Sequence, residues 1–395
     1  MRRAGRHRVG VERRSEWRHE RSLCRTGACK RRARFQVAAS PPWRRAARSG
    51  ACRIPASTTV PKEYPMTTKT AKDTVEKQQH VQHQQDVKDQ EKQAKEAGRK
   101  SSKDEPVQAG AREQPSRFPT QHLDKPGEEG DLDLAPRFLA PDYRGSGKLE
   151  GMTAIVTGGD SGIGRAVAVL FAREGADVAI VYLSEDEDAR KTASHVEAEG
   201  RQCELIKGDV QDREFCRQAV QKVVQRFGRL DVLVNNAAFQ EHAETLADLT
   251  EERLELTFRT NIFGYFHMAQ AALPHLKQGA SIINTGSVVG LRGSATLLDY
   301  ASTKGAIHAF TKSLAQNLLP QGIRVNAVAP GPVWTPLNPA DSPAKKVSEF
   351  GATSDMKRAA QPEELSPAYV YLASPVCSGY VTGIVLPVTG SVGAI

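Results

Sequence analysis

The sequence predicts an α/β fold in which helices cover both faces of a doubly wound parallel sheet. From Gly151 onward, short runs rich in Val and Ile alternate with stretches long enough to form helices. The runs are nearly continuously apolar, as strands buried on both faces are. The intervening stretches give each pair of strands the crossover that a parallel arrangement needs.

Seven such runs are present, and each predicts one strand. They lie at residues 153–158, 177–183, 203–209, 231–237, 280–287, 324–330 and 383–388. The segment that holds them, residues 151–395, is long enough to bury one sizeable core. We therefore expect a single catalytic domain with seven strands.

Residues 1–65 differ sharply from this domain in charge. They contain 18 Lys or Arg and four Asp or Glu, a net of +14, whereas the whole chain is +9, so residues 66–395 carry 9 − 14 = −5. A nucleic-acid-binding arm and an organellar transit peptide are two interpretations of this segment. We favour a third, that the segment is not part of the working protein, because Met66 begins a stretch typical of an N-terminus. Nucleic acid is accordingly not expected as a partner.

Two further segments precede the domain. Residues 66–118 are rich in Gln, Lys, Glu and Asp, with too few apolar residues to bury a face, and predict a solvated, transiently helical linker. Residues 119–150 hold several prolines and a few large apolar side chains, and predict an extended arm lying on a neighbouring surface.

Membrane and metal functions are not indicated. No apolar run approaches the length of a membrane span, and the first residues lack a secretory apolar segment. The six cysteines form no CxxC pair and no zinc-type spacing with histidine. We expect reduced thiols, no metal and a cytoplasmic protein.

The turn after the first strand, "TGGDSGIGRA", predicts a nucleotide phosphate site. Glycines permit a tight turn and close approach of a pyrophosphate, and the next helix supplies free N–H groups and positive potential at its start. A glycine cluster placed between the first strand and first helix of a seven-strand alternation is a strong signal for a Rossmann-type site. The expected cofactor contacts are Gly158, Asp160, Ser161, Gly162, Ile163 and Gly164.

The end of the second strand leaves the choice between NAD and NADP open. An acidic residue normally ends this strand and binds the adenosine ribose. Here the position falls on Tyr182, followed by Leu183, and no arginine replaces the acid to grip a 2′-phosphate. Glu185 or Asp186 could reach the ribose, although both fit the first turn of the next helix.

Seven ordered motifs make the chain resemble the short-chain dehydrogenase/reductase family. They are "TGxxxGxG" from Thr157, "GDV" from Gly208, "NNAA" from Asn235, "TN" from Thr260, "INTGS" ending at Ser287, "YASTK" from Tyr300 and "RVNAVAPGPVWTP" from Arg324. The arm "KPGEE…DYRGSGKLEG" also resembles the N-terminal extension of a bacterial subgroup of general stress or glucose-dehydrogenase-like oxidoreductases. The resemblance covers nearly everything from Leu149 to the C-terminus.

The resemblance gives Tyr300 and Lys304 a catalytic setting. Ser287 precedes Tyr300 by thirteen residues, the usual family separation. A phenol is a poor base at neutral pH, and an ammonium one helical turn away favours its ionised form. The resemblance implies that Tyr300 moves the substrate proton, Ser287 holds the substrate oxygen, and Lys304 also binds the nicotinamide ribose. Asn261 would anchor a water between Lys304 and solvent.

Further contacts to NAD or NADP carry over from the family. Asp209 would face the adenine amino group and Val210 would pack on its ring, and the nicotinamide half would meet the loops after the fourth and sixth strands. The positions so implied are Asn235, Ala237, Pro330, Gly331, Val333 and Thr335.

The polar segment from Leu337 to Ala360 corresponds to the family's variable lid over the substrate. His242 and Trp334 lie near enough in sequence to touch a substrate, but surface or packing roles are commoner for such residues. The C-terminal stretch "TGIVLPVTGSVGAI" departs from the subgroup's usual ending, which leaves details of substrate and assembly open.

These observations predict an NAD(P)-dependent oxidoreductase that interconverts an alcohol and a carbonyl. Three residues separate Tyr300 from Lys304, whereas enoyl reductases of the family generally have six, so C=O chemistry is favoured over C=C chemistry. A 3-oxoacyl-thioester reductase and a catalytically silent cofactor-sensing or nucleic-acid-binding protein are the alternatives. The resemblance also implies a homotetramer, and the sequence does not name the small-molecule substrate.

Overall fold

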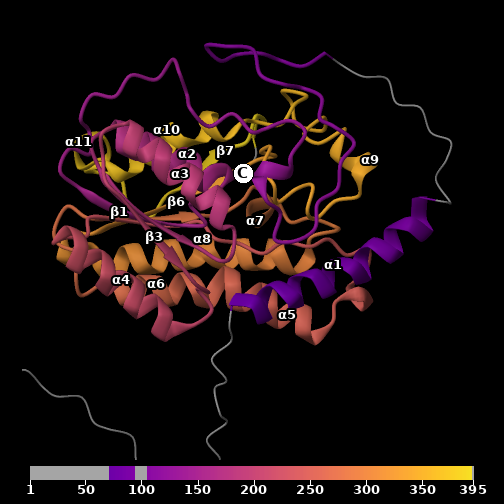
Figure 1. Cartoon of the computed structure of the whole chain (residues 1–395), viewed down its shortest axis with the longest axis horizontal. Coiled ribbons are helices and arrows are strands. Elements are labelled where there is room, and N and C mark those ends of the chain that lie inside the picture. The colour runs from indigo at the N-terminus through magenta and orange to yellow at the C-terminus, as the bar shows by residue number, and fades with distance from the viewer. Residues whose placement is uncertain (1–70, 94–104, 394–395) are drawn as a thin grey trace, which may run out of the picture. The chain divides into compact units, whose positions relative to one another are not determined.

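The computed structural model describes residues 71–93 and 105–393 (Figure 1). The interpretations offered for residues 1–65 lie outside the described residues. Within them, one sheet of seven parallel strands forms the centre, in the order β3-β2-β1-β4-β5-β6-β7. The predicted strand number, strand direction and Rossmann-type α/β class are therefore confirmed.

Each strand falls within one of the predicted apolar runs. The strands are β1 (Thr153–Thr157), β2 (Asp177–Tyr182), β3 (Cys203–Lys207), β4 (Val232–Asn235), β5 (Ser281–Thr285), β6 (Arg324–Pro330) and β7 (Val385–Val388). Every residue of β1, β4, β5 and β6 is buried, as expected for central strands. The edge strand β7 is only half-buried and contains Pro387, a residue that an edge strand tolerates.

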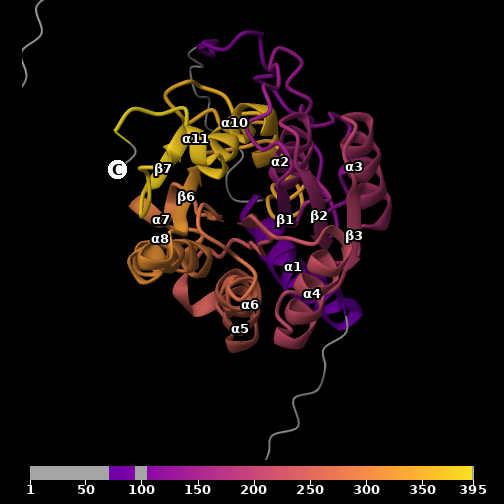
Figure 2. The same cartoon turned by 90° about the vertical axis from the view of Figure 1, so that its left-hand side faces the viewer.

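Helices form a layer on each face of the sheet (Figures 1 and 2). The helices of the domain are α2 (Gly162–Arg173), α3 (Asp186–Ala198), α4 (Arg213–Phe227), α5 (Glu251–Phe258), α6 (Gly264–Ala272), α7 (Val289–Arg292), α8 (Leu298–Leu318), α9 (Ala344–Val347), α10 (Pro362–Ala373) and α11 (Pro375–Ser378). Single 3-10 turns lie at Glu129–Asp131, Leu246–Asp248 and Leu319–Gln321.

Alternate residues of the strands belong to two separate hydrophobic cores, one on each face of the sheet. Ala154 and Val156 of β1 pack with α2, α3 and α10, whereas Ile155 packs with α4, α6 and α8. This is the period of two that a strand buried on both faces requires. The two layers hold the sheet rigidly, and the strands therefore present their carboxyl ends at fixed positions.

The order of the strands creates the place for a ligand. The chain runs outward from β1 to β3, then returns to the other side of β1 at β4. The loops after β1 and β4 leave in opposite directions, so a crevice opens between them at the carboxyl ends of the strands. Both loops contain residues that the sequence assigned to the cofactor.

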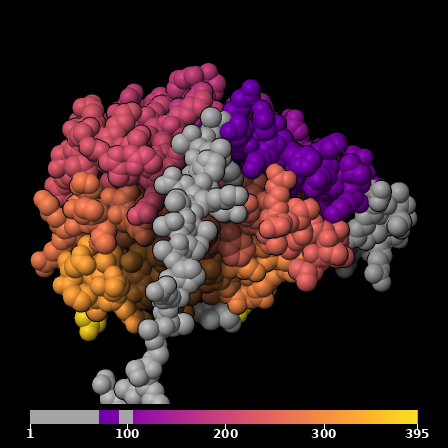
Figure 3. All heavy atoms as spheres, turned by 90° about the horizontal axis from the view of Figure 1, so that it is seen from below, coloured from indigo at the N-terminus to yellow at the C-terminus, as the bar shows by residue number. Residues whose placement is uncertain are grey.

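Residues 71–93 differ from the solvated, transient helix that we expected. They form the helix α1 (Ala71–Gln93), and one face of it is buried against the domain. Figure 3 shows α1 in indigo, lying across the surface of the domain. Polar side chains make most of this buried face, which explains why an apolar pattern failed to predict it.

Residues 105–150 follow the surface of the domain with little regular structure. The ring of Phe118 stacks on Trp334 with centroids 4.3 Å apart, and the Trp334 indole donates to the Leu134 carbonyl at 2.8 Å. Arg112 forms an ion pair with the buried Glu363. These contacts hold the extended arm against the same chain that carries the sheet.

Candidate active site

A cavity of about 410 Å³ runs along the carboxyl ends of the strands, from the loop after β3 to the loop after β6. Asp209 and Val210 line one end of it, which we call the Asp209 end. Ser287, Tyr300 and Lys304 line the other, the Tyr300 end. The cavity therefore joins residues that lie far apart in the sequence and that were predicted to contact the cofactor or its substrate.

The turn between β1 and α2 forms the middle of the cavity. Gly158 has a φ of 61°, a left-handed conformation that glycine adopts readily. A side chain on Gly164 would place its Cβ 1.9 Å from the Gly158 carbonyl oxygen, so this glycine permits the turn to close. Gly158, Asp160, Ser161, Gly162 and Ile163 line the cavity, whereas Gly164 supports it from behind.

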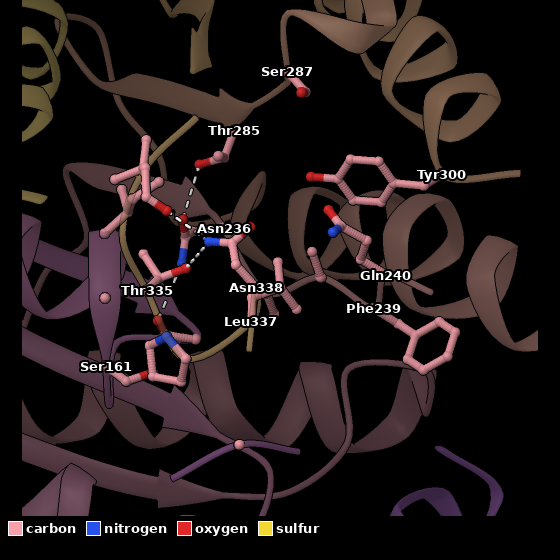
Figure 4. Close-up of a pocket in the computed structure, with 18 of the residues that line it drawn as sticks. Ser161, Asn236, Phe239, Gln240, Thr285, Ser287, Tyr300, Thr335, Leu337 and Asn338 are labelled. Atoms are coloured by element: carbon pink, nitrogen blue, oxygen red, sulfur yellow. Dashed lines mark hydrogen bonds between the residues drawn. The ribbon is translucent and has the colours of Figure 1, made fainter. Parts of the chain in front are cut away.

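Asn236 fastens this turn to its neighbours. Its amide nitrogen donates to the carbonyls of Thr157 at 3.1 Å and Gly158 at 3.0 Å, and its amide oxygen accepts from the Thr285 hydroxyl at 3.2 Å (Figure 4). One side chain thus connects the ends of β1, β4 and β5. Asn236 was not among the expected site residues, whereas its neighbour Asn235 was expected to contact the cofactor.

Asn235 does not line the cavity, for a simple geometric reason. Asn235 is the last residue of β4, fully buried, and its amide donates to the Asn284 side chain at 3.0 Å inside the sheet. Successive strand residues point to opposite faces, so a shift of one position moves the side chain out of the cavity. Ala237, beyond the strand and also an expected cofactor contact, does line the cavity.

The Tyr300 end brings together three of the four predicted catalytic residues. The Tyr300 hydroxyl points into the cavity, and Ser287 and Gln240 lie on either side of it in Figure 4. Lys304 lies one turn further along α8, with its Nζ 5.2 Å from the centre of the Tyr300 ring. That Nζ donates to the Thr285 carbonyl at 2.8 Å.

Burial sets the protonation of this pair. It raises the pKa of Tyr300 well above its usual value, with Asp341 adding to the rise and Ser287 opposing it. It lowers the pKa of Lys304 to about 7. Burial of Tyr300 therefore opposes the phenolate that we expected Lys304 to favour.

Asn261 does not line the cavity. It lies in the five-residue π-helical segment Arg259–Phe263 between α5 and α6, a feature that often marks functional sites. Its side chain accepts from the Phe239 amide at 2.8 Å, and donates to the Phe239 carbonyl at 2.9 Å and to the Thr303 hydroxyl at 3.1 Å. Asn261 thus fixes the loop after β4 against α8, and its expected role in anchoring a water stays a prediction.

The Asp209 end is rich in carboxylates. Tyr182 and Leu183, two expected cofactor contacts, line it, and Asp160 and Glu185 line it too. Burial and the neighbouring Asp160 raise the pKa of Glu185 to about 8. Of the two acids considered for the ribose, Glu185 faces the cavity, whereas Asp186 bonds Tyr182 and Lys207 near the surface.

A carboxylate from the arm occupies the start of α2. The Gly162 amide donates to Glu129 Oε2 at 2.8 Å, and Arg165 of α2 bonds Glu129 Oε1 and Asp188. All three side chains are buried. The arm thus satisfies one free N–H group at this helix start, behind the cavity wall.

The loop after β6 and the predicted lid complete the Tyr300 end. Pro330, Gly331, Val333 and Thr335, all expected cofactor contacts, line the cavity. Leu337, Asn338, Phe350, Gly351 and Thr353 line it further along the chain. Neither His242 nor Trp334 lines it. Trp334 is fully buried against the arm, and His242 belongs to a buried charge cluster.

That cluster contains the one group of metal-type side chains in residues 71–93 and 105–393: Glu241, His242 and Asp341. His242 contacts Asp341 at 2.8 Å and Asp89 of α1 at 2.5 Å, and Lys125 pairs with Glu241 at 3.1 Å. Burial opposes the imidazolium, but these carboxylates outweigh it and raise the pKa of His242 to about 11. The cluster is therefore a network of paired charges.

The fold and cavity define a nucleotide-binding scaffold, and comparisons identify its family. A family model described as enoyl-(acyl carrier protein) reductase matches residues 158–392. The uncharacterized oxidoreductase YhdF of Bacillus subtilis is 54% identical over 271 residues, which are 68% of this chain and 93% of that protein. The chloroplastic NADPH-dependent aldehyde reductase 1 of Arabidopsis thaliana is 49% identical over 276 residues, 68% of this chain and 96% of that protein.

Two solved structures show the same fold with a cofactor. A short-chain dehydrogenase from Burkholderia cenocepacia in complex with NADP gives a TM-score of 0.58 at 34% identity, covering 62% of this chain and 98% of that one. A short-chain dehydrogenase from Mycobacterium paratuberculosis bound to NAD gives 0.57 at 30%, with the same coverage. The chain belongs to the short-chain dehydrogenase/reductase family and is an NAD(P)-dependent oxidoreductase.

The residues present fit a dinucleotide. The glycine turn leaves room where side chains would collide, the start of α2 faces the middle of the cavity, and the cavity is continuous from Asp209 to Tyr300. None of the described helices has the length and apolar character needed to cross a membrane.

Proposed function

We propose that the protein interconverts an alcohol and a carbonyl by hydride transfer, with Tyr300 as the general acid and base. The observation that carries this proposal is the meeting of Tyr300, Ser287 and Lys304 at one end of a cavity whose middle fits a dinucleotide phosphate. Bound NAD(P) supplies or accepts the hydride. The chain's own residues hold the substrate oxygen and move its proton.

The protonation of the pair favours the direction from carbonyl to alcohol. Since burial raises the pKa of Tyr300, its phenol keeps the proton at neutral pH and can donate it to the oxygen of a reduced carbonyl. Ser287 lies beside that oxygen's expected position as a hydrogen-bond donor. Lys304, 5.2 Å from the ring centre, then stabilises the phenolate that forms.

The walls of the Tyr300 end support a small substrate with polar groups. Gln240 and Asn338 offer amide oxygens and Arg292 a guanidinium, while Leu297, Leu337 and Phe350 offer apolar surface. Such a wall suits an aldehyde, a ketone or a sugar with hydroxyl groups. The aldehyde reductase named among the relatives supports an aldehyde as the first substrate to assay.

The name of the matching family model makes enoyl reduction a second candidate. In that reaction hydride reaches a C=C bond conjugated to a thioester. Three residues separate Tyr300 from Lys304, and this spacing argues against enoyl reduction. It places the Lys304 amine over the ring that carries the Tyr300 hydroxyl. A 3-oxoacyl-thioester reductase, or a silent cofactor-sensing protein, are further alternatives that the same assay separates.

The experiment is a substrate panel with purified protein. Aldehydes, ketones, sugars, a 3-oxoacyl thioester and an enoyl thioester are each assayed by oxidation of NADH and of NADPH at 340 nm. We expect turnover of an aldehyde or a ketone, and a loss of at least 10³-fold in Tyr300→Phe with cofactor binding retained. Tyr380→Phe is the matched control, because Tyr380 is fully exposed.

The outcomes are distinct. Turnover of the enoyl thioester alone rejects C=O chemistry, and unchanged turnover in Tyr300→Phe rejects the mechanism. Cofactor binding without turnover of any compound favours the silent protein.

We further propose a homotetramer in the cytoplasm. Phe263 and Phe266 are 48% and 40% exposed on neighbouring turns, and Phe266 packs on Phe310 of α8 with ring centroids 4.0 Å apart. Exposed aromatic side chains grouped in this way are typical of subunit contacts. Light scattering coupled to size-exclusion chromatography tests the assembly, and a monomeric mass contradicts it. The three described cysteines are free thiols, which suits a reducing compartment.

A further inference from the structure

The helix α1 presents an unusual buried face to the domain. The buried residues recur at helical spacing, and all but one are polar: Thr74, Gln78, Val81, Gln82, Gln85 and Asp89. The exception, Val81, packs with Phe239 and Leu256. A buried polar side chain costs free energy unless it is hydrogen-bonded, so the partners of this face show what the helix is fastened to.

Most of the face is fastened to the domain. The Gln82 amide donates to the carbonyls of Leu123 at 2.6 Å and Ala340 at 2.9 Å, and its oxygen accepts from the Lys125 amide at 2.8 Å. Asp89 pairs with the buried His242 at 2.5 Å. This end of α1 is thus an integral part of the structure.

The first turns of α1 lie differently, because their side chains line the cofactor cavity. Thr74 and Gln78 line it together with Asp209, Val210, Tyr182 and the glycine turn. The Thr74 hydroxyl donates to Asp209 Oδ2. Gln78 is only 6% exposed, yet among the described residues its amide has no hydrogen-bond partner.

We propose that α1 forms the outer wall of the adenosine half of the cofactor site. In this arrangement the Gln78 amide binds polar atoms of the adenosine, and Thr74 positions the Asp209 carboxylate. An amide can donate to a ring nitrogen of adenine and accept from its amino group, or it can bond a ribose hydroxyl. The proposal rests on the orientation of NAD(P) in the proposed function, with adenosine at the Asp209 end.

The alternative is that α1 plugs the site and inhibits binding. One observation favours a wall. The cavity still measures about 410 Å³ and remains continuous from Asp209 to Tyr300 with α1 in place.

Binding of half-cofactors to the full chain tests the proposal. Dissociation constants for 5′-AMP, nicotinamide mononucleotide and NADH are measured by calorimetry. We expect Gln78→Ala to weaken 5′-AMP and NADH by about 3- to 10-fold, the effect of one lost hydrogen bond, and to leave nicotinamide mononucleotide unchanged. Gln90→Ala is the matched control, because Gln90 is exposed on the same helix.

Thr74 acts through Asp209, so its test needs a conservative rescue. Thr74→Val removes the hydroxyl at nearly the same volume and should weaken 5′-AMP several-fold, and Thr74→Ser should restore the affinity. In steady-state kinetics Gln78→Ala and Thr74→Val should raise KM for the cofactor with kcat unchanged.

Each of the following outcomes contradicts the proposal that α1 forms the outer wall of the adenosine site. Tighter 5′-AMP binding in Gln78→Ala shows that α1 is a plug, and unchanged 5′-AMP binding shows that the helix does not contact adenosine. Weakening of both half-cofactors alike shows a general structural effect. If the unmodified protein does not bind 5′-AMP, the assumed cofactor orientation fails, and with it the proposal, whereas carbonyl turnover is tested separately.

Discussion

The two ends of the cavity come from different parts of the chain and carry different charges. The Tyr300 end is made by β5, α8 and the loops after β4 and β6, with one buried amine, Lys304, at its base. The Asp209 end combines the loops after β2 and β3 with the first turns of α1. It carries the carboxylates of Asp160, Glu185 and Asp209.

The difference indicates that the two ends of the cavity have separate functions. Groups that exchange protons need fixed positions, and the Tyr300 end is built on the rigid core. The Asp209 end contacts a part of the cofactor that does not react, so segments added before the domain can shape it without disturbing the chemistry. We therefore expect changes at the Tyr300 end to alter kcat, and changes at the Asp209 end to alter cofactor affinity and choice.

After Tyr300→Phe, the largest expected effect comes from Lys304→Met. Loss of the amine that stabilises the phenolate should lower kcat by about 10³-fold, or roughly 4 kcal/mol. The protein should nevertheless become more stable, by about 2 kcal/mol at pH 7, because a buried amine is replaced by an apolar side chain of similar length. The Thr285 carbonyl keeps the Tyr265 hydroxyl as a donor at 3.2 Å.

The pH dependence of that stabilisation has a definite sign. Lys304 has a pKa of about 7 in the folded protein and 10.5 as its ordinary value, so the unfolded chain binds the extra proton between these values. The cost of burying Lys304 is therefore complete below pH 7 and disappears as the pH rises to about 10.5. Thermal unfolding at pH 6.5 and 10 measures it, with the exposed Lys312→Met as control. A destabilised Lys304→Met at pH 6.5 contradicts the argument.

The sequence predicted the core and the Tyr300 end of the cavity better than the segments that shape the Asp209 end. The seven strands were predicted because buried strands need apolar residues, and the Tyr300 end because its residues keep fixed separations along one strand and one helix. Asn261 and Asn235 do not line the cavity, since sequence spacing does not reveal the direction of a side chain. Asn236, one position from Asn235, lines it instead.

The helix α1 could not be predicted from hydrophobic periodicity, because glutamine, threonine and aspartate make its buried face. A polar pattern was available: Thr74, Gln78, Gln82, Gln85 and Asp89 recur every three or four residues. Nothing in the sequence, however, distinguishes such a face from a solvated one, because its partners are backbone carbonyls and a buried histidine far along the chain. Glu129 at the start of α2 was missed for the same reason.

A smaller effect is expected from Asp89→Asn, which removes one carboxylate from the buried His242. The protonated imidazole keeps Asp341 and Glu241, so we expect docking of α1 to weaken by about 2 to 3 kcal/mol without global unfolding. Hydrogen exchange of the α1 amides should then be about 100-fold faster. Asp86→Asn is the matched control, since Asp86 contacts His122 at 3.3 Å near the surface. Unchanged exchange in Asp89→Asn would show that this contact does not hold the helix.

The docking of α1 should also depend on pH in one direction. The pKa of His242 rises from 6.5 to about 11 on folding. The contribution of the protonated imidazole to the docking of α1 is therefore complete below pH 6.5 and is lost as the pH rises through 11. Exchange corrected for its intrinsic pH dependence should therefore show weaker docking at pH 9 than at pH 6. Asp89→Asn should reduce this difference.

The smallest effect concerns the choice of cofactor and depends on Glu185. Since the pKa of Glu185 is about 8, its carboxyl group ionises within the accessible pH range and then repels a 2′-phosphate at the Asp209 end. The ratio of KM for NADP to KM for NAD should rise about tenfold between pH 7 and 9.5, and Glu185→Gln should abolish that rise. Asp186→Asn is the control, because Asp186 bonds Lys207 near the surface.

Stability should change with Glu185 in the same pH range. An ordinary glutamate has a pKa of 4.5, so between pH 4.5 and about 8 the folded protein retains a proton that the unfolded chain has released. Stability is therefore lost as the pH rises through this range, and Glu185→Gln should remove part of that loss. A ratio of KM values that stays constant with pH in the unmodified protein would place Glu185 away from the 2′ position, and the two ends of the cavity would then differ in shape but not in their electrostatic choice of cofactor.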